Sequence, residues 1–227
     1  MKDELLDEIL RDMRETRQYT GKDTLSPQVY AAMDAVQRHL FVPETLRDAA
    51  WDNNPLPIGE GQTISQPFIV ALMTELLELP GPGEGGRDEP VRVLELGTGS
   101  GYQAAVLARI ADEVYSIEVV KPLADRAAER LKKLGYANVH VRYADGTLGW
   151  PEMAPFDGII VTAAGVEVPR ALLTQLKAGA RLVIPVGGQY DAQQLLVITR
   201  KADGSFAQRK ALPVRFVPIT APKSGPS

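Results

Sequence analysis

Residues 93–102, Val-Leu-Glu-Leu-Gly-Thr-Gly-Ser-Gly-Tyr, form the stretch of sequence that decides the fold. They join a short apolar run, which predicts a strand over 91–96, to a segment over 103–111 with apolar residues at helical spacing. Glycines at such a junction permit a tight turn and let a ligand approach the backbone without a Cβ in the way. In open α/β sheets the ligand crevice lies beyond the carboxyl ends of the strands, where this loop belongs. The stretch therefore predicts a ligand-binding loop at the edge of a parallel sheet.

Downstream of this loop, short apolar runs alternate with helical segments. We expect the further strands and helices of this half at the following positions: strands over 114–117, 139–143, 157–162, 181–186 and 195–200, helices over 122–134 and 169–177, and a β segment over 211–217. A hairpin signal at Asp203-Gly204 precedes the last segment. This alternation indicates an α/β fold with a mostly parallel central sheet, helices on both faces and antiparallel C-terminal strands.

Upstream, the sequence predicts an N-terminal helical extension. Helices are expected over 3–14, from Pro27 to about Phe41, and over 67–79, whereas residues 47–66 are rich in Asn, Pro and Gly and predict a long irregular loop. The chain thus reads as one domain of 227 residues. Its parts are the helices and loop of residues 1–79, a Gly/Pro linker at 80–90, a core at 91–200 and a C-terminal hairpin and tail at 201–227.

The composition excludes several classes of function. The chain has no cysteine and two histidines, which excludes disulfides, thiol nucleophiles and cysteine-ligated metals and leaves no multi-histidine metal site. The net charge of −4 offers no basic face for nucleic acid. No window approaches the roughly 20 apolar residues of a membrane span. We expect a cytoplasmic monomer that uses no metal and binds neither nucleic acid nor a membrane.

The spacing of the glycines favours one cofactor over another. A dinucleotide loop reads G-x-G-x-x-G, but here the pattern is G-x-G-x-G and Tyr102 stands where the last glycine should be. The carboxylate of Glu95, just before the loop, would repel a pyrophosphate and suit a cationic ligand. Both departures favour S-adenosylmethionine over a nicotinamide dinucleotide.

Two further strand ends carry acidic residues. Glu118 follows Gly97 by 21 positions, and an acid about 20 residues past the loop can accept hydrogen bonds from ribose hydroxyls. Asp145-Gly146 falls at the same edge and is suited either to the adenine amino group or to a simple turn. Together the three strand ends are similar to the nucleoside-binding set of class I (Rossmann-like) methyltransferases. A nicotinamide-dependent oxidoreductase and a non-catalytic binding module remain as alternatives.

The class of methyl acceptor can be inferred from motifs that the sequence lacks. After the fourth strand, residues 161–165 contain none of the Asn/Asp-Pro-Pro-aromatic signature of enzymes that methylate amines. His39 and His140 lie outside the nucleoside set, so no general base is evident. A carboxyl group, with an ordinary pKa of about 3.3–4.3, is already ionised at neutral pH and needs no base. The pattern therefore favours a carboxylate acceptor that the enzyme only has to position.

Residues 55–67, Pro-Leu-Pro-Ile-Gly-Glu-Gly-Gln-Thr-Ile-Ser-Gln-Pro, resemble the signature loop of protein-L-isoaspartate (D-aspartate) O-methyltransferases. Other segments match that family in order, namely 38–43, 93–102, 155–164, 182–187 and 214–218. The resemblance implies methyl transfer from S-adenosyl-L-methionine, with S-adenosyl-L-homocysteine as product, to the free α-carboxyl of L-isoaspartyl and more weakly D-aspartyl residues of damaged proteins and peptides. The ester would collapse to a succinimide. A methyltransferase of a small carboxylic acid is the alternative.

The resemblance also assigns residues. Ser65 matches the catalytic serine, for which we expect an orienting role because no Ser-His-Asp arrangement is visible. The implied substrate-binding residues are Ile58, Thr63, Ile64, Ser65, Val214 and Phe216. The expected cofactor-binding residues are Gln66, Pro67, Phe68, Glu95, Leu96, Gly97, Gly99, Gly101, Glu118, Asp145 and Gly146. Residues 214–217 resemble a strand that pairs with the backbone of the substrate.

Overall fold

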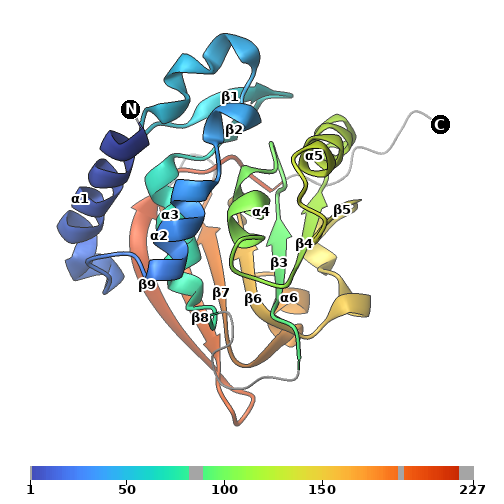
Figure 1. Cartoon of the computed structure of the whole chain (residues 1–227). Coiled ribbons are helices and arrows are strands. Elements are labelled where there is room, and N and C mark those ends of the chain that lie inside the picture. Colours follow the sequence, from blue (N-terminus) through green and yellow to red (C-terminus); the bar gives the residue numbers. More distant parts are fainter. Residues whose placement is uncertain (1, 82–88, 189–191, 220–227) are drawn as a thin grey trace.

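A seven-stranded sheet forms the centre of the computed structural model, which describes residues 2–81, 89–188 and 192–219 (Figure 1). Its strands are β3 (Arg92–Leu96), β4 (Glu113–Glu118), β5 (Val139–Tyr143), β6 (Phe156–Val161), β7 (Leu176–Val186), β8 (Gln193–Arg200) and β9 (Phe206–Val214). Their order is β5-β4-β3-β6-β7-β8-β9. The first five strands in this order are parallel to one another, β8 pairs with β7 in the antiparallel sense, and β9 pairs with β8 in the same way. Because the chain order reverses between β3 and β6, a ligand crevice is expected at the carboxyl ends of these two strands.

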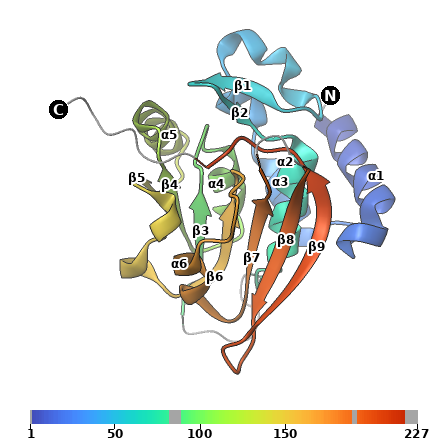
Figure 2. The same ribbon diagram turned by 180° about the vertical axis from the view of Figure 1, so that it is seen from behind.

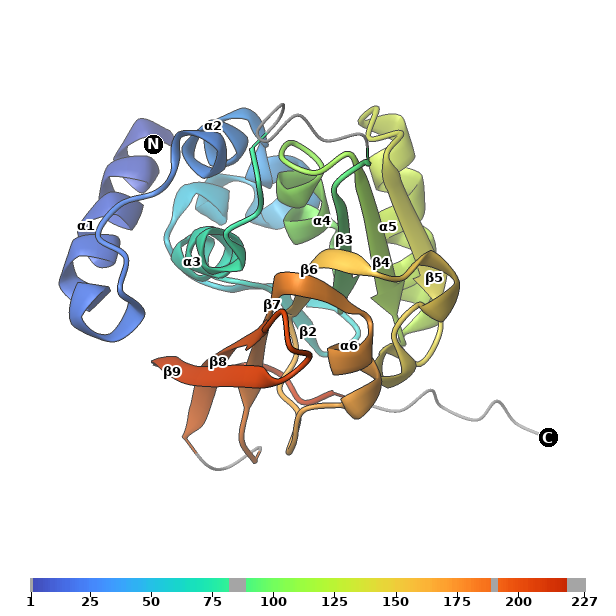
Figure 3. The ribbon, with the colours of Figure 1, turned by 90° about the horizontal axis from the view of Figure 1, so that it is seen from below.

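The helices cover the two faces of the sheet unequally (Figure 3). The helices are α1 (Lys2–Thr20), α2 (Pro27–Ala35), α3 (Pro67–Leu77), α4 (Tyr102–Leu107), α5 (Lys121–Lys133) and α6 (Arg170–Thr174). Helices α2 to α5 lie over one face, with α1 outside α3 and β9, whereas the short α6 lies on the other (Figures 1 and 3). The prediction of helices on both faces is confirmed in this uneven form. In the described residues no helix is long and apolar enough to cross a lipid bilayer.

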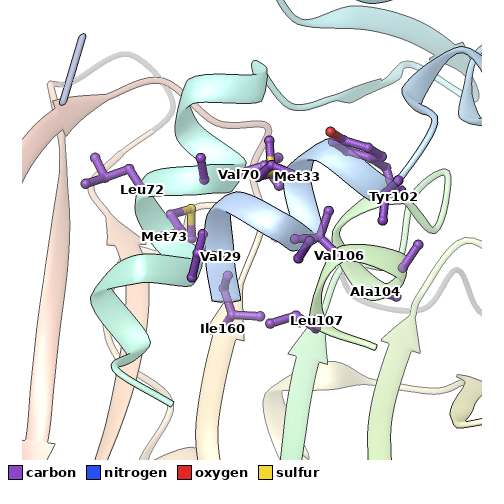
Figure 4. Close-up of a cluster of buried hydrophobic side chains, with 14 of the residues drawn as sticks. Val29, Met33, Val70, Leu72, Met73, Tyr102, Ala104, Val106, Leu107 and Ile160 are labelled. Atoms are coloured by element: carbon purple, nitrogen blue, oxygen red, sulfur yellow. The ribbon is translucent and has the colours of Figure 1, made fainter. Parts of the chain in front are cut away.

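Alternation along the strands produces two apolar cores. Successive residues of a strand point to opposite faces, so Val93 joins the core under α2 to α4 and Leu94 the core on the α6 side. Figure 4 shows the first core, in which Val29 of α2, Met73 of α3 and Ile160 of β6 converge. This packing anchors the helical extension to the same sheet that carries the glycine loop.

Several predicted boundaries need correction. The first helix continues beyond the predicted end at 14 to Thr20, which is itself buried. The second ends at Ala35, and a separate 3₁₀ helix spans Arg38–Phe41. The helix predicted over 169–177 is shorter, and its last two residues belong to β7, which starts at Leu176 rather than 181. Most of the 80–90 linker lies outside the described residues.

The segment 47–66 is not an irregular loop. It contains the 3₁₀ helix Asp48–Trp51 and an antiparallel hairpin of β1 (Leu56–Gly59) and β2 (Gln62–Ile64), which lies across the carboxyl-end edge of the sheet (Figure 2). The hairpin escaped prediction because its strands are only four and three residues long, and because Pro57 is a poor strand former. Its turn is formed by Gly59, Glu60 and Gly61, all at positive φ.

The last strand is displaced from its predicted position. The β segment expected over 211–217 is the strand Phe206–Val214, whose first five residues are all exposed. Those residues carry no alternation of apolar and polar side chains, so the periodicity from which strands are predicted is absent. Residues 215–217, beyond the strand, return along the carboxyl-end edge toward β6 (Figure 2), where the Ala164 N–H donates to the Val217 carbonyl (2.8 Å).

Candidate active site

A cleft of about 850 Å³, including space open to solvent, lies at the carboxyl ends of β3, β4 and β6. Its walls come from the glycine loop, the ends of the neighbouring strands, the β1–β2 hairpin and the chain after β9. The lining includes Thr63, Ser65, Leu96, Gly97, Thr98, Gly99, Tyr102, Ile117, Glu118, Gly146, Thr147, Val161, Thr162 and Val217. The cleft therefore occupies the place that the reversal of strand order predicts.

The glycine loop closes tightly on the end of β6. Gly97, Gly99 and Gly101 all have positive φ, at 94°, 54° and 89°. A Cβ on Gly97 would lie only 2.4 Å from Oγ1 of Thr162, whose hydroxyl donates to the Leu96 and Gly97 carbonyls (2.9 and 2.6 Å). Glycine at 97 is thus required both by the backbone conformation and by the close approach of Thr162.

Glu118 ends β4 inside the cleft and is almost fully buried. Its Oε1 accepts the N–H groups of Val119 and Val120, both at 2.9 Å, and its Oε2 accepts the N–H of Gly99 at 2.8 Å. A carboxylate offers about four lone-pair positions, so one on Oε2 remains for a ligand hydroxyl. Glu118 therefore holds the glycine loop and still lines the cleft as a hydrogen-bond acceptor.

Glu95 is placed differently from the expectation that it faces the cationic end of the cofactor. Its carboxylate is fully buried beneath the glycine loop and does not line the cleft. Oε2 accepts a hydrogen bond from the Ser116 hydroxyl, which also lies 2.6 Å from Oγ1 of Thr98. Burial raises the pKa of Glu95 to about 8, with the Glu118 charge adding to the rise and the Ser116 hydrogen bond opposing it. Glu95 thus supports the loop from below.

Asp145 is likewise occupied within its own turn. Its Oδ1 accepts the Thr147 N–H (2.9 Å) and the Thr147 hydroxyl (2.7 Å), which caps the short 3₁₀ helix Gly146–Leu148. Gly146 and Thr147 line the cleft, whereas Asp145 does not. The turn of Asp145-Gly146 is therefore present, and the contact with the adenine amino group stays a prediction, because Oδ2 of Asp145 makes no hydrogen bond to a described residue.

A second, wider cavity of about 1,750 Å³, including open space, adjoins the cleft. It is a groove between α1, the start of α3 and the chain leaving β9; its lining includes Asp12, Glu15, Thr16, Thr63, Ser65, Gln66, Phe68, Thr162, Val214, Arg215, Phe216 and Val217. Four of these residues, Thr63, Ser65, Thr162 and Val217, line both cavities. The cleft and the groove therefore meet at the turn that contains Ser65.

Ser65 presents its hydroxyl at this junction, and among the described residues that line the two cavities there is no histidine. The side chain is half-buried, and its hydroxyl makes no hydrogen bond to another described residue. Both histidines lie elsewhere: the ring of His39 lies against Trp51 in a tilted arrangement, and His140 bonds to Glu113 on another part of the surface. Ser65 is therefore suited to donating a hydrogen bond and not to acting as an activated nucleophile.

The remaining predicted residues divide between the cavities. Thr63, Ile64, Leu96, Gly97, Gly99 and Gly146 line the cleft, and Val214 and Phe216 line the groove. Gln66 and Phe68 face the groove and not the cofactor cleft, and Pro67 and Gly101 line neither. Ile58, expected at the substrate, is instead buried against the outer side of the glycine loop, where a Cβ on Gly99 would lie 3.4 Å from its Cδ1. Ile58 lies in β1, where alternate side chains point to opposite sides of the hairpin.

Sequence reasoning missed the contribution of the N-terminal third. Asp12 accepts a hydrogen bond from Nδ2 of Asn53 (2.8 Å), and Oδ1 of Asn53 accepts the N–H of Phe68 at the start of α3 (3.0 Å). Asn53 thus caps the helix that follows Ser65. No local signal marks this pair, because the partners lie 41 and 15 positions apart in sequence.

The residues present fit the nucleoside end of S-adenosylmethionine. Glu118 retains an acceptor position for a ribose hydroxyl, and the apolar side chains of Leu96, Ile117 and Val161 provide walls for an aromatic base. The glycine loop leaves backbone exposed on the side from which the ligand would approach. Fold and cleft together are those of an S-adenosylmethionine-dependent methyltransferase with a Rossmann-like sheet.

Comparison with known proteins narrows this class. The family model described as protein-L-isoaspartate(D-aspartate) O-methyltransferase matches residues 9–224. A relative from Polaromonas sp., named protein-L-isoaspartate O-methyltransferase 2, is 52% identical over 216 residues, covering 95% of this chain and 99% of its own. A relative of the same name from Syntrophobacter fumaroxidans is 54% identical over 213 residues, covering 94% and 83% of the two chains.

Solved structures agree. A protein-L-isoaspartate O-methyltransferase superposes with a TM-score of 0.80 at 28% identity, covering 97% of this chain and 66% of that one. A Plasmodium falciparum protein, described as a candidate enzyme of this kind and solved with S-adenosyl-L-homocysteine, gives a TM-score of 0.73 at 25% identity, covering 95% and 98% of the two chains. The chain belongs to the protein-L-isoaspartate(D-aspartate) O-methyltransferase family. It is an S-adenosylmethionine-dependent protein-L-isoaspartate O-methyltransferase, an enzyme of protein repair.

Proposed function

We propose that the acceptor carboxylate of the isoaspartyl residue binds where the two cavities meet, with Ser65 orienting it toward the cofactor. The observation that carries this proposal is the shared lining of Thr63, Ser65, Thr162 and Val217. A group held at that junction touches both the cofactor cleft and the substrate groove. The Ser65 hydroxyl, which has no partner among the described residues, donates a hydrogen bond to one carboxylate oxygen and leaves the other for the reaction.

Methyl transfer to an ionised carboxylate requires mainly that the enzyme align the two reacting groups. When bound, S-adenosylmethionine supplies an electrophilic methyl group on a positively charged sulfur. The acceptor carboxylate is already ionised at neutral pH, because free carboxyl groups have pKa values of about 3.3–4.3. A general base is therefore not needed for this reaction. Alignment of reacting groups alone can contribute up to roughly 7–11 kcal/mol to catalysis in favourable systems.

The groove is suited to an extended peptide of varied sequence. The side chain of Gln193 satisfies both backbone groups of Phe216: it donates a hydrogen bond to the Phe216 carbonyl (3.0 Å) and accepts one from the Phe216 N–H (2.6 Å). The backbone groups of the adjacent Arg215, by contrast, make no hydrogen bond to a described residue, and Arg215 lines the groove. We assign the pairing with the substrate backbone to Arg215. Main-chain pairing accepts many flanking sequences, as repair of damaged proteins requires.

The product and setting follow from this role. The methyl ester of an L-isoaspartyl residue collapses to a succinimide, whose hydrolysis returns part of the material to normal aspartate; D-aspartyl residues are weaker substrates. Isoaspartyl-containing proteins are the substrates implied by the family. The enzyme acts as a cytoplasmic monomer, a proposal that fractionation of cells and light scattering of the purified chain test directly.

The decisive test pairs two peptides that differ at one linkage. Methyl transfer from labelled S-adenosylmethionine is measured with an isoaspartyl peptide, the matching aspartyl peptide, and succinate as a small carboxylic acid. We expect turnover of the isoaspartyl peptide alone. Equal turnover of the aspartyl peptide would contradict recognition of the altered backbone, and turnover of succinate alone would favour a methyltransferase of small acids.

A further inference from the structure

A fully buried arginine lies directly behind the Ser65 turn. Arg38, in the 3₁₀ helix Arg38–Phe41, has no exposed surface. Its Nη1 donates to the carbonyls of Ala50 (2.7 Å) and Asp52 (3.2 Å). Its Nη2 donates to the carbonyls of Asn54 (2.7 Å) and Ser65 (3.2 Å). One guanidinium thus joins the segment 50–54 to the backbone of Ser65.

This arrangement is unusual because a buried cation normally has an anionic partner. Arg38 forms no ion pair with a described residue, and its Nε has no hydrogen-bond partner among them. Burial lowers the pKa of Arg38 to about 10, with Tyr102 and Asp52 opposing the change, so the group is charged at neutral pH. The desolvation of that charge is offset by the four carbonyl dipoles, by the Tyr102 ring 6.0 Å away and by the more distant charge of Asp52, with which Arg38 forms no ion pair. An unpaired buried charge lowers the stability of the fold. Its presence therefore indicates that the backbone geometry held by Arg38 is needed.

The location of Arg38 indicates what that geometry serves. Tyr102, against which the guanidinium lies, lines the cofactor cleft, and Ser65 lines both the cleft and the groove. We propose that Arg38 is a positioning residue for the acceptor site, which holds the Ser65 turn at the junction by bridging its carbonyl to that of Asn54. The proposal rests on the role given above to Ser65.

The planar fork of the guanidinium is what the bridge requires. Its two terminal nitrogens each contact two carbonyls, in directions set by the plane of the group. A lysine ammonium is a single point with three donors on a flexible stem, so it keeps the charge but cannot reach both pairs of carbonyls. Arg38→Lys therefore separates geometry from charge, and Arg38→Gln removes both.

The experiment compares these two variants with a matched control. Arg181→Gln also removes a partly buried arginine that donates to a backbone carbonyl, that of Leu76 (3.3 Å), but Arg181 lines neither cavity. Thermal unfolding, the dissociation constant of S-adenosyl-L-homocysteine, and kcat and KM for an isoaspartyl peptide are measured for all three. Both Arg38 variants should lose at least about tenfold in kcat/KM for the peptide, since small misplacements at a reacting centre cost this much or more.

Cofactor affinity separates positioning from general damage. We expect the dissociation constant of S-adenosyl-L-homocysteine to change less than about threefold in the Arg38 variants, and Arg181→Gln to keep wild-type kinetics even where it loses stability. Wild-type kcat/KM in a folded Arg38→Lys would overturn the proposal. So would a parallel loss of peptide turnover and cofactor affinity, because that pattern describes a damaged fold and not a positioned acceptor site.

A second measurement on the wild-type enzyme keeps the proposal testable should the variants not fold. Nitrogen-15 labelling of arginine allows the side-chain signals of Arg38 to be followed by NMR. We expect these signals to shift when an isoaspartyl peptide binds to the complex with S-adenosyl-L-homocysteine, and no shift with the aspartyl peptide. Unchanged signals on peptide binding would overturn the proposal. If Ser65→Ala is fully active, the role of Ser65 fails; if Ser65→Ala is impaired while Arg38→Lys is normal, only the role of Arg38 fails.

Discussion

The cleft at the glycine loop and the groove beside it are built in opposite ways. The main parts of the cleft come from neighbouring strand ends, and their polar groups are hydrogen-bonded to one another. The Gly99 N–H donates to Glu118 Oε2 (2.8 Å), and the Thr162 hydroxyl donates to the Gly97 carbonyl (2.6 Å). The groove is about twice as large, at roughly 1,750 Å³ against 850 Å³, and is assembled from α1, the hairpin, the start of α3 and the chain after β9. Its backbone at Arg215 is left unpaired within the described residues.

This difference matches the ligands. The cofactor has one shape, so a preformed and internally bonded cleft loses little on binding it. The proposed substrate is a peptide of variable sequence with one altered linkage, for which the groove offers unpaired backbone groups at Arg215 and one fixed point, the Ser65 turn. Substitutions on the cofactor side should therefore change cofactor affinity, and substitutions at the junction should change peptide turnover alone.

Gly97→Ala should have the largest effect on the cofactor side. The new Cβ meets Thr162 Oγ1 at 2.4 Å at a φ of 94°, so strain and overpacking together cost about 2–4 kcal/mol. Calorimetric titration with S-adenosyl-L-homocysteine should show a corresponding loss of affinity. Gly179→Ala is the control, because Gly179 has a similar φ of 83° in open space. Equal cofactor affinity in the two variants would contradict the close approach at Gly97.

Ser65→Ala tests the junction. Loss of a hydrogen bond to a charged group costs about 1.5–3 kcal/mol, so kcat/KM for an isoaspartyl peptide should fall by roughly ten- to a hundredfold. Affinity for S-adenosyl-L-homocysteine should stay at the wild-type value. Ser26→Ala is a suitable control, because Ser26 precedes α2 without a side-chain capping bond. A fully active Ser65→Ala enzyme would remove the orienting role.

Glu118→Ala tests the contribution of the Glu118 carboxylate to cofactor binding in the cleft. Removal of the carboxylate takes away the acceptor for ribose and leaves three loop N–H groups without their partner, so cofactor affinity should fall by roughly 1–3 kcal/mol. Glu113→Ala, at the other end of the same strand, removes only a surface contact with His140 and should bind the cofactor normally. Unchanged affinity of Glu118→Ala would refute the ribose role.

Glu95→Gln tests the support beneath the glycine loop. Because the folded-state pKa of Glu95 is raised from 4.5 to about 8, the folded protein between these pH values keeps a proton that the unfolded chain releases. The free energy of unfolding therefore falls with rising pH in this window, by up to about 1.4 kcal/mol per pH unit. Denaturant unfolding between pH 5 and about 9 should show a flatter dependence for Glu95→Gln. Parallel curves for the two proteins would contradict the buried, protonated state.

Asp145→Ala should have the smallest effect on binding. The side chain caps a 3₁₀ helix through Thr147, so its loss should cost about 1 kcal/mol of stability. Cofactor affinity should change by less than about threefold, because Asp145 does not line the cleft. Thermal unfolding and calorimetry measure the two effects separately. A loss of affinity that exceeds the loss of stability would restore the contact between Asp145 and adenine.

How much was predictable differs between the same two regions. The glycine loop, Glu118 and the alternation of strands and helices are local features, and the structure places them as the sequence indicates. Glu95 was misjudged because sequence shows that an acid precedes the loop but not that Ser116 of the neighbouring strand shields it. At Asp145 the structure shows the turn through Oδ1, and the contact with adenine stays a prediction.

The groove depended on contacts between distant segments. Only the family resemblance drew attention to Ser65, Val214 and Phe216, because none of them stands in a pattern that spacing or periodicity reveals. The capping of α3 by Asn53 and the bridge from Arg38 to Ser65 span 15 and 27 positions. Such contacts follow from tertiary packing, which local propensities do not contain.

A crystal structure with S-adenosyl-L-homocysteine and an isoaspartyl peptide bound together tests most directly whether the two cavities form one reaction site. The free α-carboxylate should lie within hydrogen-bond distance of the Ser65 hydroxyl, at about 2.5–3.0 Å. Its second oxygen should face the sulfur of the homocysteine, and the peptide backbone should pair with Arg215. A carboxylate bound away from Ser65, or a sulfur directed away from the groove, would contradict this arrangement.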